Sequence, residues 1–134
     1  MKNKTTDGVH VTIGMTGASL SDSESNGPSL ALTNFDITSI QDNNAQTYSM
    51  TGTGRVTDSN LNGYLDFTVS TASPLQGGLS DPYPTAGSIT LTGASNTTVT
   101  LTATTGSDIQ LAVDSNGDGQ PDDRLTRTWR DLNP

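Results

Sequence analysis

Apolar and polar residues alternate with a period of two over several short stretches of the chain. This spacing is typical of a β-strand that packs one face against a core and turns the other toward water. The clearest alternation predicts strands at Val9/Val11/Ile13/Met15, Leu65/Phe67/Val69, Ile89/Leu91, Val99/Leu101/Ala103 and Ile109/Leu111/Val113. Weaker members of the same series are Tyr48/Met50 and Leu125/Arg127/Trp129.

Leu30/Leu32 and Phe35/Ile37 also alternate, but the two pairs are out of phase with each other. A single regular strand would turn one pair toward the core and the other toward solvent. We therefore expect a β-bulge or bend near Thr33 and Asn34, which would bring both pairs to the same face.

The stretches between the predicted strands are rich in Gly, Asn, Asp, Ser and Pro, which favour turns. They cover residues 22–28, 42–46, 58–63, 74–87, 94–97, 105–108 and 114–123. Short connections pair neighbouring strands antiparallel, and one apolar face per strand requires a covering layer. The sequence therefore predicts an all-β fold, an antiparallel β-sandwich or flattened barrel of about 8–10 short strands.

The chain length of 134 residues fits a single domain. We expect a loose leader at residues 1–7 and one β-domain over residues 8–134. Within it, the proline-rich segment Pro74 to Pro84 is expected to form a crossover or an exposed loop, because it is too long for a hairpin turn. Only Thr128 to Leu132 could hold a terminal helical turn.

The amino-acid composition argues against some classes of binding partner and favours some cellular locations. The hydrophobic share of 30% predicts a thin core, and the net charge of −8 with only six Lys and Arg argues against nucleic acid or an anionic membrane surface. The chain contains no apolar run of about 20 residues, so membrane insertion is not expected. No apolar segment of the kind found in signal peptides follows the N-terminus. We expect an excised domain or a processed chain. The lack of cysteine and the Asx-, Gly- and Thr-rich composition favour a bacterial protein that is extracellular, periplasmic or attached to the outer membrane.

The segment from Asp114 to Asp123 places oxygen-bearing side chains at alternate positions of a turning loop. It resembles the D-x-[DN]-x-[DN]-G opening of the EF-hand calcium loop, with Gly119 at the sixth position. The Ca²⁺ ligands that this resemblance implies are Asp114, Asn116, Asp118, the carbonyl of Gln120, and Asp122, with Asp123 as the alternative to Asp122. Position 12 holds Leu125 in place of the bidentate Glu, so the expected affinity is weak, about 10⁻⁴ to 10⁻³ M.

An alternative explanation of this loop needs no metal. Asn116–Gly117 and Asp118–Gly119 are dipeptides that strongly favour hairpin turns by themselves. The two explanations are compatible, since a hairpin loop can also hold an ion.

A second stretch, from Asp58 to Asp66, matches the first loop position for position. Its candidate ligands for a weaker second site are Asp58, Asn60, Asn62 and Asp66. Either a strand–acidic turn–strand unit was duplicated, giving degenerate hairpin repeats, or hairpins of similar composition converged on similar turns.

Residues suited to catalysis are few. His10 is the only histidine, Glu24 is the only glutamate, and the chain has neither a cysteine nor a G-x-S-x-G motif. We therefore predict that the protein is not an enzyme. A serine-based triad would have to use His10.

Threonines alternate with the apolar residues at Thr90/Thr92 and at Thr98/Thr100/Thr102/Thr104, so they are expected on one face of adjacent strands. A flat T-x-T surface resembles ice-binding proteins, but this ladder is expected to last only two strands. A solvated sheet face, where threonine is favoured, is the preferred interpretation. Trp129 is expected to close one end of the domain as a core residue rather than to form a ligand platform.

From Pro84 to Leu132 the chain resembles a segment of uncharacterised exported bacterial proteins and lipoproteins. The shared frame is G-x-[IL]-x-[IL]-T-G-A, then V-D-x-N-G-D-G, then T-W-x-x-L, carried here by Gly87–Ala94, Val113–Gly119 and Thr128–Leu132. The resemblance implies export and a β-rich, non-catalytic domain, and it implies no particular activity.

Together these features predict a non-enzymatic secreted or cell-envelope β-domain with a weak, structural Ca²⁺-binding hairpin loop. The alternative is an adhesion or ligand-recognition module of a larger surface protein, which would use exposed loops such as residues 74–87 to bind a protein or a glycan. The chain would act as a monomer or as part of a larger chain.

Overall fold

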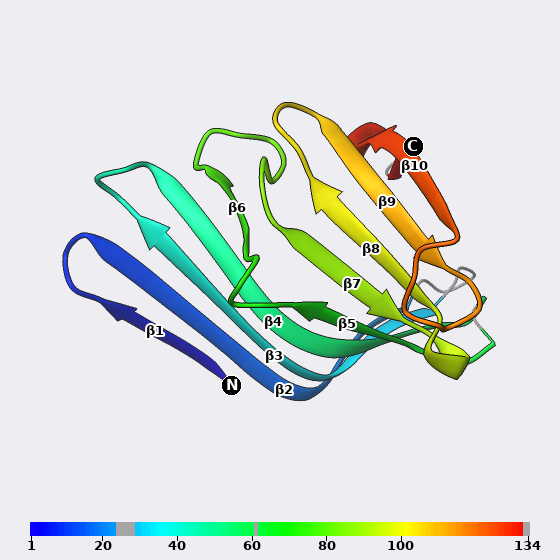
Figure 1. Cartoon of the computed structure of the whole chain (residues 1–134). Helices are drawn as coiled ribbons and strands as arrows, with labels where there is room; N and C mark the ends of the chain where they lie inside the picture. Colours follow the sequence, from blue (N-terminus) through cyan, green and yellow to red (C-terminus); the bar gives the residue numbers. More distant parts are fainter. Residues whose placement is uncertain (24–28, 61, 133–134) are drawn as a thin grey trace.

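The computed structural model describes residues 1–23, 29–60 and 62–132, and these form β-strands joined by turns (Figure 1). The strands are β1 (Lys2–Thr6), β2 (His10–Ser23), β3 (Ser29–Asp42), β4 (Thr47–Asp58), β5 (Leu65–Val69), β6 (Leu75–Gly78), β7 (Ser88–Thr92), β8 (Thr98–Ala103), β9 (Asp108–Asp114) and β10 (Asp123–Thr128). Two single turns of 3₁₀-helix, η1 (Ala94–Asn96) and η2 (Trp129–Leu132), complete them. The all-β prediction and the predicted terminal helical turn are therefore confirmed. The described residues contain no helix of the length and apolar character needed to span a membrane.

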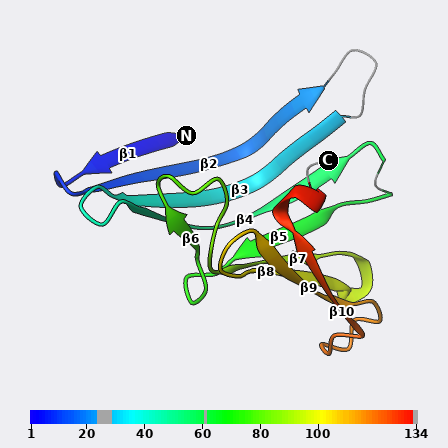
Figure 2. The same cartoon turned by 90° about the horizontal axis from the view of Figure 1, so that it is seen from above.

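The strands form one antiparallel sheet in the order β1-β2-β3-β4-β5-β7-β8-β9-β10. The sheet does not close, because its path ends at β1 on one side and at β10 on the other. It is strongly curved, so that β2 and β3 lie along one side of the molecule and β8 to β10 along the other (Figure 2). This open, curved sheet is consistent with the predicted sandwich or flattened barrel.

Along one of its two edges, β4 pairs with two different strands. Its first residues pair with β6 and its later residues, from Gly52 to Val56, pair with β5. The segment from Pro74 to Pro84 was expected to be a crossover or an exposed loop, but the structure places the short strand β6 within it. The prediction missed β6 because two of its four residues, Gly77 and Gly78, carry no side chain and so give no alternation.

The predicted irregularity in β3 is present. The register between β3 and β4 shifts between Thr33 and Asp36, and Asn34 adopts a positive φ of 48°. The bulge brings Phe35 into the core, where it is 7% exposed, while Leu32 on the other side of the bulge is half-buried. Leu30, at the far end of the strand, stays 50% exposed.

The core is as thin as the composition indicates. Apart from the residues that the structure does not describe, its buried apolar side chains are Phe35, Val69, Leu75, Leu101, Ala103 and Ile109. Ile109 is the one among them that is fully shielded from solvent. A row of facing residues on this apolar side runs from Phe67 on β5 through Leu91 and Val99 to Val113 on β9.

The opposite face of the sheet carries the predicted threonines. Thr90 faces Thr100 across β7 and β8, with 3.2 Å between their hydroxyl oxygens, and Thr92 faces Thr98. The ladder was expected to last two strands, but it is longer, because Thr68 on β5 faces Thr90 and Thr53 on β4 faces Thr68. Because the sheet itself is strongly curved (Figure 2), the strands that carry these threonines do not form a flat surface.

Residues 1–7 were expected to form a loose leader, and the structure corrects this. Lys2–Thr6 forms the edge strand β1 and pairs with β2. The hydrophobic pattern of the sequence did not predict β1, because this strand contains no apolar residue. Lys2 lies opposite Met15 and Lys4 opposite Ile13, so the lysines stand beside the apolar side of the sheet at its edge.

Connections at one end of the sheet position the candidate site. The β4–β5, β7–β8 and β9–β10 connections all emerge from the end drawn at lower right in Figure 1. They contain the two predicted Ca²⁺ loops and η1. The opposite end holds the β1–β2, β3–β4 and β8–β9 turns together with η2.

Candidate functional site

The loop predicted to bind Ca²⁺ joins β9 to β10, and it is organised around Asp114. Asp114 is the last residue of β9 and is 4% exposed, which makes it the one buried charged side chain among the described residues. One carboxylate oxygen accepts the backbone N–H of Gly117 at 2.7 Å and the other accepts that of Gly119 at 2.8 Å. The carboxylate therefore replaces the backbone acceptors that a turning chain lacks.

Two of the other predicted ligands make turns of their own. The side-chain oxygen of Asn116 accepts the N–H of Asp118 at 2.9 Å, and that of Asp118 accepts the N–H of Gln120 at 2.8 Å. Each bond spans two residues, which is the geometry of an Asx turn. The alternation of Asn and Asp thus gives the loop a repeated local bend.

Asp122 closes the loop. Its Oδ2 accepts the backbone N–H of Ser115 at 2.8 Å and the Ser115 hydroxyl at 2.7 Å, while its Oδ1 accepts the amide of Asn116 at 3.0 Å. The hydrogen bonds from Ser115, the side-chain one first, lower the pKa of the Asp122 carboxyl below its usual value of 3.8. Ser115 was not among the predicted site residues, although its place directly after Asp114 could have suggested it.

The loop also packs against η1. A β-carbon added to Gly117 would collide with the carbonyl oxygen of Ser95, and Gly117 has a φ of +76°. Gly119 has a similar φ of +85°, but nothing lies within 4 Å of the place where its β-carbon would be. The close approach between Gly117 and η1 therefore anchors one side of the loop to the β7–β8 connection.

The predicted ligands share one loop, but their carboxylates are not gathered into a cluster. Within the described part of the chain, no group of three His, Cys, Asp or Glu side chains is placed to hold a metal ion. Each Asp114 oxygen already accepts one hydrogen bond, and a carboxylate oxygen has two lone pairs, so capacity for a cation remains. The burial of Asp114 means that a cation would reach it only with some rearrangement of the loop.

The loop at 114–123 carries several negative charges that no nearby positive side chain neutralises in the described structure. Asp114, Asp118, Asp122 and Asp123 lie within ten residues. Among the described residues, none of these carboxylates forms an ion pair with a lysine or an arginine. The loop is therefore held together by hydrogen bonds while its charges repel one another.

The candidate ligands of the second loop are divided between two structures. Asp58 accepts the N–H of Asn60 at 2.7 Å, as in an Asx turn. Asp66 faces Arg55 across β4 and β5, and the guanidinium holds its carboxylate with two bonds of 2.7 and 3.0 Å. Asn62 is exposed, and position 61 lies outside the described residues. Asp66 is thus already paired with a cationic side chain. The sequence motif did not reveal this ion pair, because Arg55 lies outside the loop on the neighbouring strand.

Arg55 joins Asp66 to an aromatic ring. Its guanidinium carbon lies 3.6 Å from the centre of the Tyr64 ring, a cation–π contact. Bonding to Arg55 lowers the pKa of the Asp66 carboxyl. The contact fixes the end of the β4–β5 connection.

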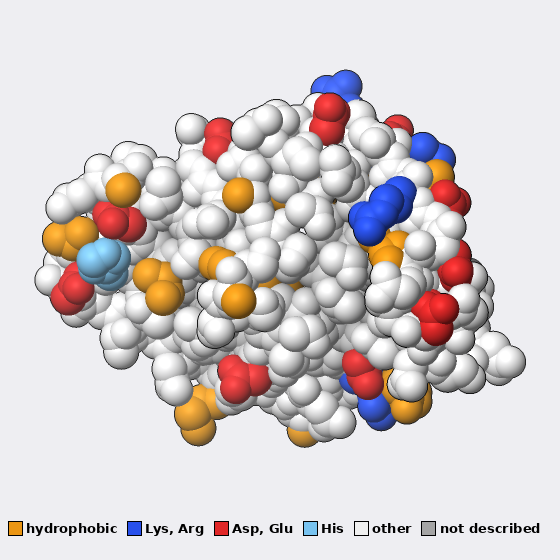
Figure 3. All heavy atoms as spheres, viewed as in Figure 1, with side chains coloured by type: hydrophobic (Ala, Val, Ile, Leu, Met, Phe, Trp, Pro, Cys, Tyr) orange, Lys and Arg blue, Asp and Glu red, His pale blue; other side chains and the backbone are white. Residues whose placement is uncertain are grey.

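His10, the one candidate for acid–base catalysis, lies between two carboxylates at the other end of the sheet (Figure 3). Its Nδ1 is 3.0 Å from Asp7 and its Nε2 is 3.3 Å from Asp42. The side-chain hydrogen bond to Asp7 and the charge of Asp7, with smaller contributions from Asp42, raise the pKa of His10 above 6.5. Both ring nitrogens are thus engaged, and the arrangement ties the β1–β2 turn to the end of β3.

Trp129 closes the domain through contacts with the β6–β7 connection. Its indole lies parallel to the Tyr83 ring, with 5.9 Å between ring centres and 9° between planes. Its Nε1 donates a hydrogen bond to the carbonyl of Pro84 at 3.1 Å. The indole is half-buried, in η2 rather than on the face of a continuing strand.

Comparison with known proteins gave no relative: no family model, no curated protein and no solved structure matched this chain. The resemblance of residues 84–132 to exported bacterial proteins therefore stays a prediction. Arguments about function rest on the site itself.

Proposed function

We propose that this chain is a non-enzymatic β-domain of a secreted or cell-envelope protein, in which Ca²⁺ weakly stabilises the hairpin loop at 114–123. The observation that carries the proposal is the buried carboxylate of Asp114 at the base of that loop. It is held by two backbone N–H groups and, in the described structure, by no cationic side chain.

The physical argument concerns uncompensated charge. Removing a carboxylate from water is costly, and two neutral N–H donors return only part of that cost. Asp118, Asp122 and Asp123 add further negative charge nearby. A divalent cation with a preference for oxygen ligands would relieve both effects.

The same geometry argues for weak binding. The loop closes without an ion through its Asx turns and the contacts of Asp122 with Ser115. Leu125 stands where an EF-hand has its bidentate Glu. The ion would therefore stiffen a loop that is already folded, which is a structural role and not a sensing one.

Two features support a non-catalytic domain. The single histidine of the chain has both ring nitrogens engaged by Asp7 and Asp42. Neither serine nor threonine is among the hydrogen-bond partners of its ring in the described structure. A base held in this way is not poised to activate a nucleophile.

Unfolding in urea, with and without about 10 mM CaCl₂, tests the calcium proposal. With a Kd of about 10⁻⁴ to 10⁻³ M, the free energy of unfolding should rise by about 1.4–2.7 kcal/mol. MgCl₂ at the same concentration should have a smaller effect, because Mg²⁺ demands a more regular coordination shell.

Matched variants separate the loop from general salt effects. Asp118→Ala should abolish the response to Ca²⁺, whereas Asp108→Ala, an exposed acid at the far end of β9, should keep it. An unchanged stability of the wild type in Ca²⁺, or an equal response of both variants, would refute the proposal.

Location needs an experiment of its own. If the parent protein lies in the cell envelope or outside the cell, protease added to intact cells, or to cells with a permeabilised outer membrane, should digest this domain. A domain that remains protected until the inner membrane is broken would contradict the proposed location.

A further inference from the structure

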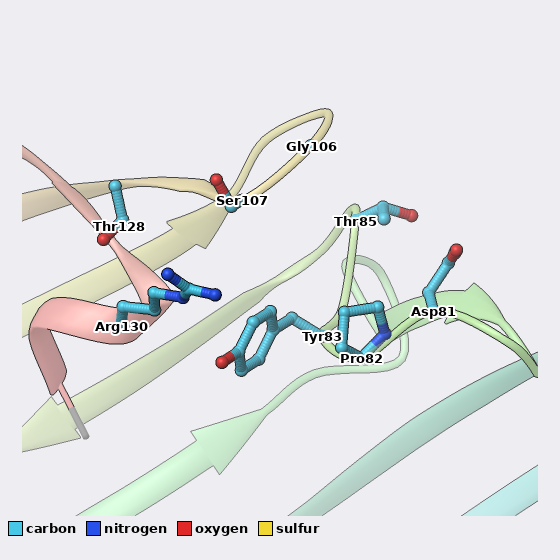
Figure 4. Close-up of a pocket in the computed structure, with 8 residues that line it drawn as sticks. All are labelled: Asp81, Pro82, Tyr83, Thr85, Gly106, Ser107, Thr128 and Arg130. Carbon is cyan, nitrogen blue, oxygen red and sulfur yellow. The ribbon is translucent and has the colours of Figure 1, made fainter. Parts of the chain in front are cut away.

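A hollow opens at the end of the sheet opposite the calcium loop, with a volume of 590 Å³ (Figure 4). Three separate segments form its walls: the β6–β7 connection, the β8–β9 turn and the end of the chain. The side chains that matter for recognition are Asp81, Tyr83, Thr85, Ser107, Thr128 and Arg130. The volume is within the range of about 300–1,000 Å³ found for small-molecule sites.

The walls of the hollow are held in place by bonds behind them. Trp129 stacks on Tyr83 and donates a hydrogen bond to the carbonyl of Pro84. Asp81 accepts the N–H of Gly78 at 2.7 Å through its Oδ2. Asp131 accepts the N–H of Thr128 at 2.7 Å, which fixes the start of η2. Side chains fixed before a ligand arrives lose little entropy on binding.

The aromatic ring of Tyr83 has one surface left for a ligand. Trp129 stacks against one side of the ring and does not line the hollow, whereas Tyr83 does, so the hollow lies against a part of Tyr83 that Trp129 leaves uncovered. An aromatic surface of this kind packs well against the C–H groups of a ligand while its hydroxyl stays available for hydrogen bonds.

Donors and acceptors converge from several sides. Figure 4 shows the Arg130 guanidinium reaching over the hollow toward Tyr83, with Asp81 on the far side. Arg130 is exposed and has no hydrogen bond or ion pair to another side chain in the described structure. Ser107, Thr128 and Thr85 are the other polar residues that line the hollow.

We propose that this hollow is a binding site for a neutral saccharide unit. The hydroxyls of a sugar both donate and accept, so those on one side of the ring can accept from Arg130 and those on the opposite side can donate to Asp81, while the C–H face of the sugar packs on Tyr83. One carboxylate and one guanidinium also balance the local charge. An acidic ligand is disfavoured because the chain has a net charge of −8.

The same features argue against a peptide. A bound peptide strand gains most of its affinity from backbone bonds to a sheet edge. The walls here come from connections and η2, and the polar groups that line them are side chains. The site is also separate from the calcium loop, so it depends on neither the ion nor the loop.

Titration of the ¹⁵N-labelled protein with a panel of neutral oligosaccharides, built from glucose, xylose, mannose, galactose and N-acetylglucosamine, tests the proposal. At least one should shift the amide signals of Gly106, Ser107 and Arg130 and the indole signal of Trp129, the only tryptophan. Acidic oligosaccharides and an acidic peptide are run in parallel.

Arg130→Ala should weaken binding by about tenfold or more, since it removes charged hydrogen-bond donors and touches no described internal contact. Arg124→Ala is the matched control: Arg124 is also exposed, but it lies on β10 outside the hollow and its loss should leave binding unchanged. No shift with any neutral sugar, shifts outside the hollow, preference for the acidic ligands or the peptide, or full binding by Arg130→Ala would each overturn the proposal.

Discussion

Gly54 lies directly opposite Phe67 in the β4–β5 pair, and a β-carbon on Gly54 would come within 2.5 Å of Cε1 of the Phe67 ring. The same β-carbon would lie 3.1 Å from Cβ of Phe35. Gly54 therefore leaves room for the Phe67 ring, while the Phe35 ring lies over Gly17, its facing residue on β2. An aromatic ring that covers a facing glycine also shields the glycine backbone from water.

Gly54→Ala should lower the free energy of unfolding by about 1–3 kcal/mol, because the added methyl group must displace the Phe67 ring. Gly14→Ala is the matched control on β2, where nothing lies within 4 Å of the new β-carbon. It should leave stability unchanged or raise it slightly, because alanine restricts the unfolded chain. Urea unfolding measures both, and an equal loss in the two variants would contradict the packing argument.

The calcium loop offers a second matched pair of glycines. Gly117→Ala and Gly119→Ala both place alanine at a positive φ, which costs about 1–2 kcal/mol. Only the alanine at 117 would also collide with the Ser95 carbonyl. We expect Gly117→Ala to be the more destabilising by at least about 1 kcal/mol. Equal losses would mean that the loop and η1 do not pack together.

Trp129 makes two interactions at the end of the domain, a ring stack and a hydrogen bond, and two variants measure them separately. Trp129→Phe keeps an aromatic ring but removes the donor to Pro84, so it should cost about 1–3 kcal/mol. Tyr83→Phe keeps the stacked ring and loses no described internal hydrogen bond, so its stability should be close to that of the wild type. A larger loss in Tyr83→Phe than in Trp129→Phe would contradict this assignment.

The contacts of His10 predict a pH dependence. Asp7, with a smaller contribution from Asp42, holds the pKa of His10 above 6.5 in the folded state. The resulting stability is fully present below pH 6.5 and is lost as the pH rises through the raised pKa. The pKa of Asp7 falls from 3.8 to about 2, chiefly through backbone and side-chain hydrogen bonds with His10, so its contribution is present above 3.8 and is lost as the pH falls toward 2.

NMR titration of the His10 ring should give a pKa above 6.5, and Asp7→Asn should lower it more than Asp42→Asn. His10→Asn should be less stable than the wild type at about pH 5.5, with a smaller difference at about pH 9. A difference that does not change between these pH values would show that the charge of His10 has no role in stability.

The ion pair of Asp66 predicts how the second loop responds to Ca²⁺. Asp66→Asn removes a carboxylate that Arg55 already engages, so the response of the protein to Ca²⁺ should stay at the wild-type level. Asp118→Ala provides the contrasting variant. If Asp66→Asn lowers the response as much as Asp118→Ala does, Asp66 is a ligand and its bond to Arg55 gives way to the metal.

The sequence predicts the fold wherever a side-chain pattern exists. Leu32 and Phe35 are out of phase, and that conflict placed the bulge at Thr33 and Asn34, where the register shifts. β1 and β6 were missed because their residues form a strand only through partners on β2 and β4. Backbone pairing of this kind leaves no mark on the hydrophobic pattern.

The candidate site was predictable in its residues but not in their contacts. The motif singled out Asp114 and Asp122, yet it could not show that Asp114 is buried or that Asp122 bonds to Ser115. The pairing of Asp66 with Arg55 could have been predicted, because the two residues are equally far in sequence from the centre of the predicted turn at 58–63 and would face each other in a hairpin. The hollow at Tyr83 was not, since its walls come from segments far apart in the chain.

The near coincidence of strand order with chain order has a consequence for folding kinetics. Apart from β6, and from β7 where it meets β5, each strand pairs with the strand that precedes or follows it in the chain. Pairings between sequence neighbours close only short loops, so the entropy lost before the first stabilising contacts form is small. The slowest step should then be the pairing of β6 with β4 and of β7 with β5, where the order of the sheet departs from that of the chain.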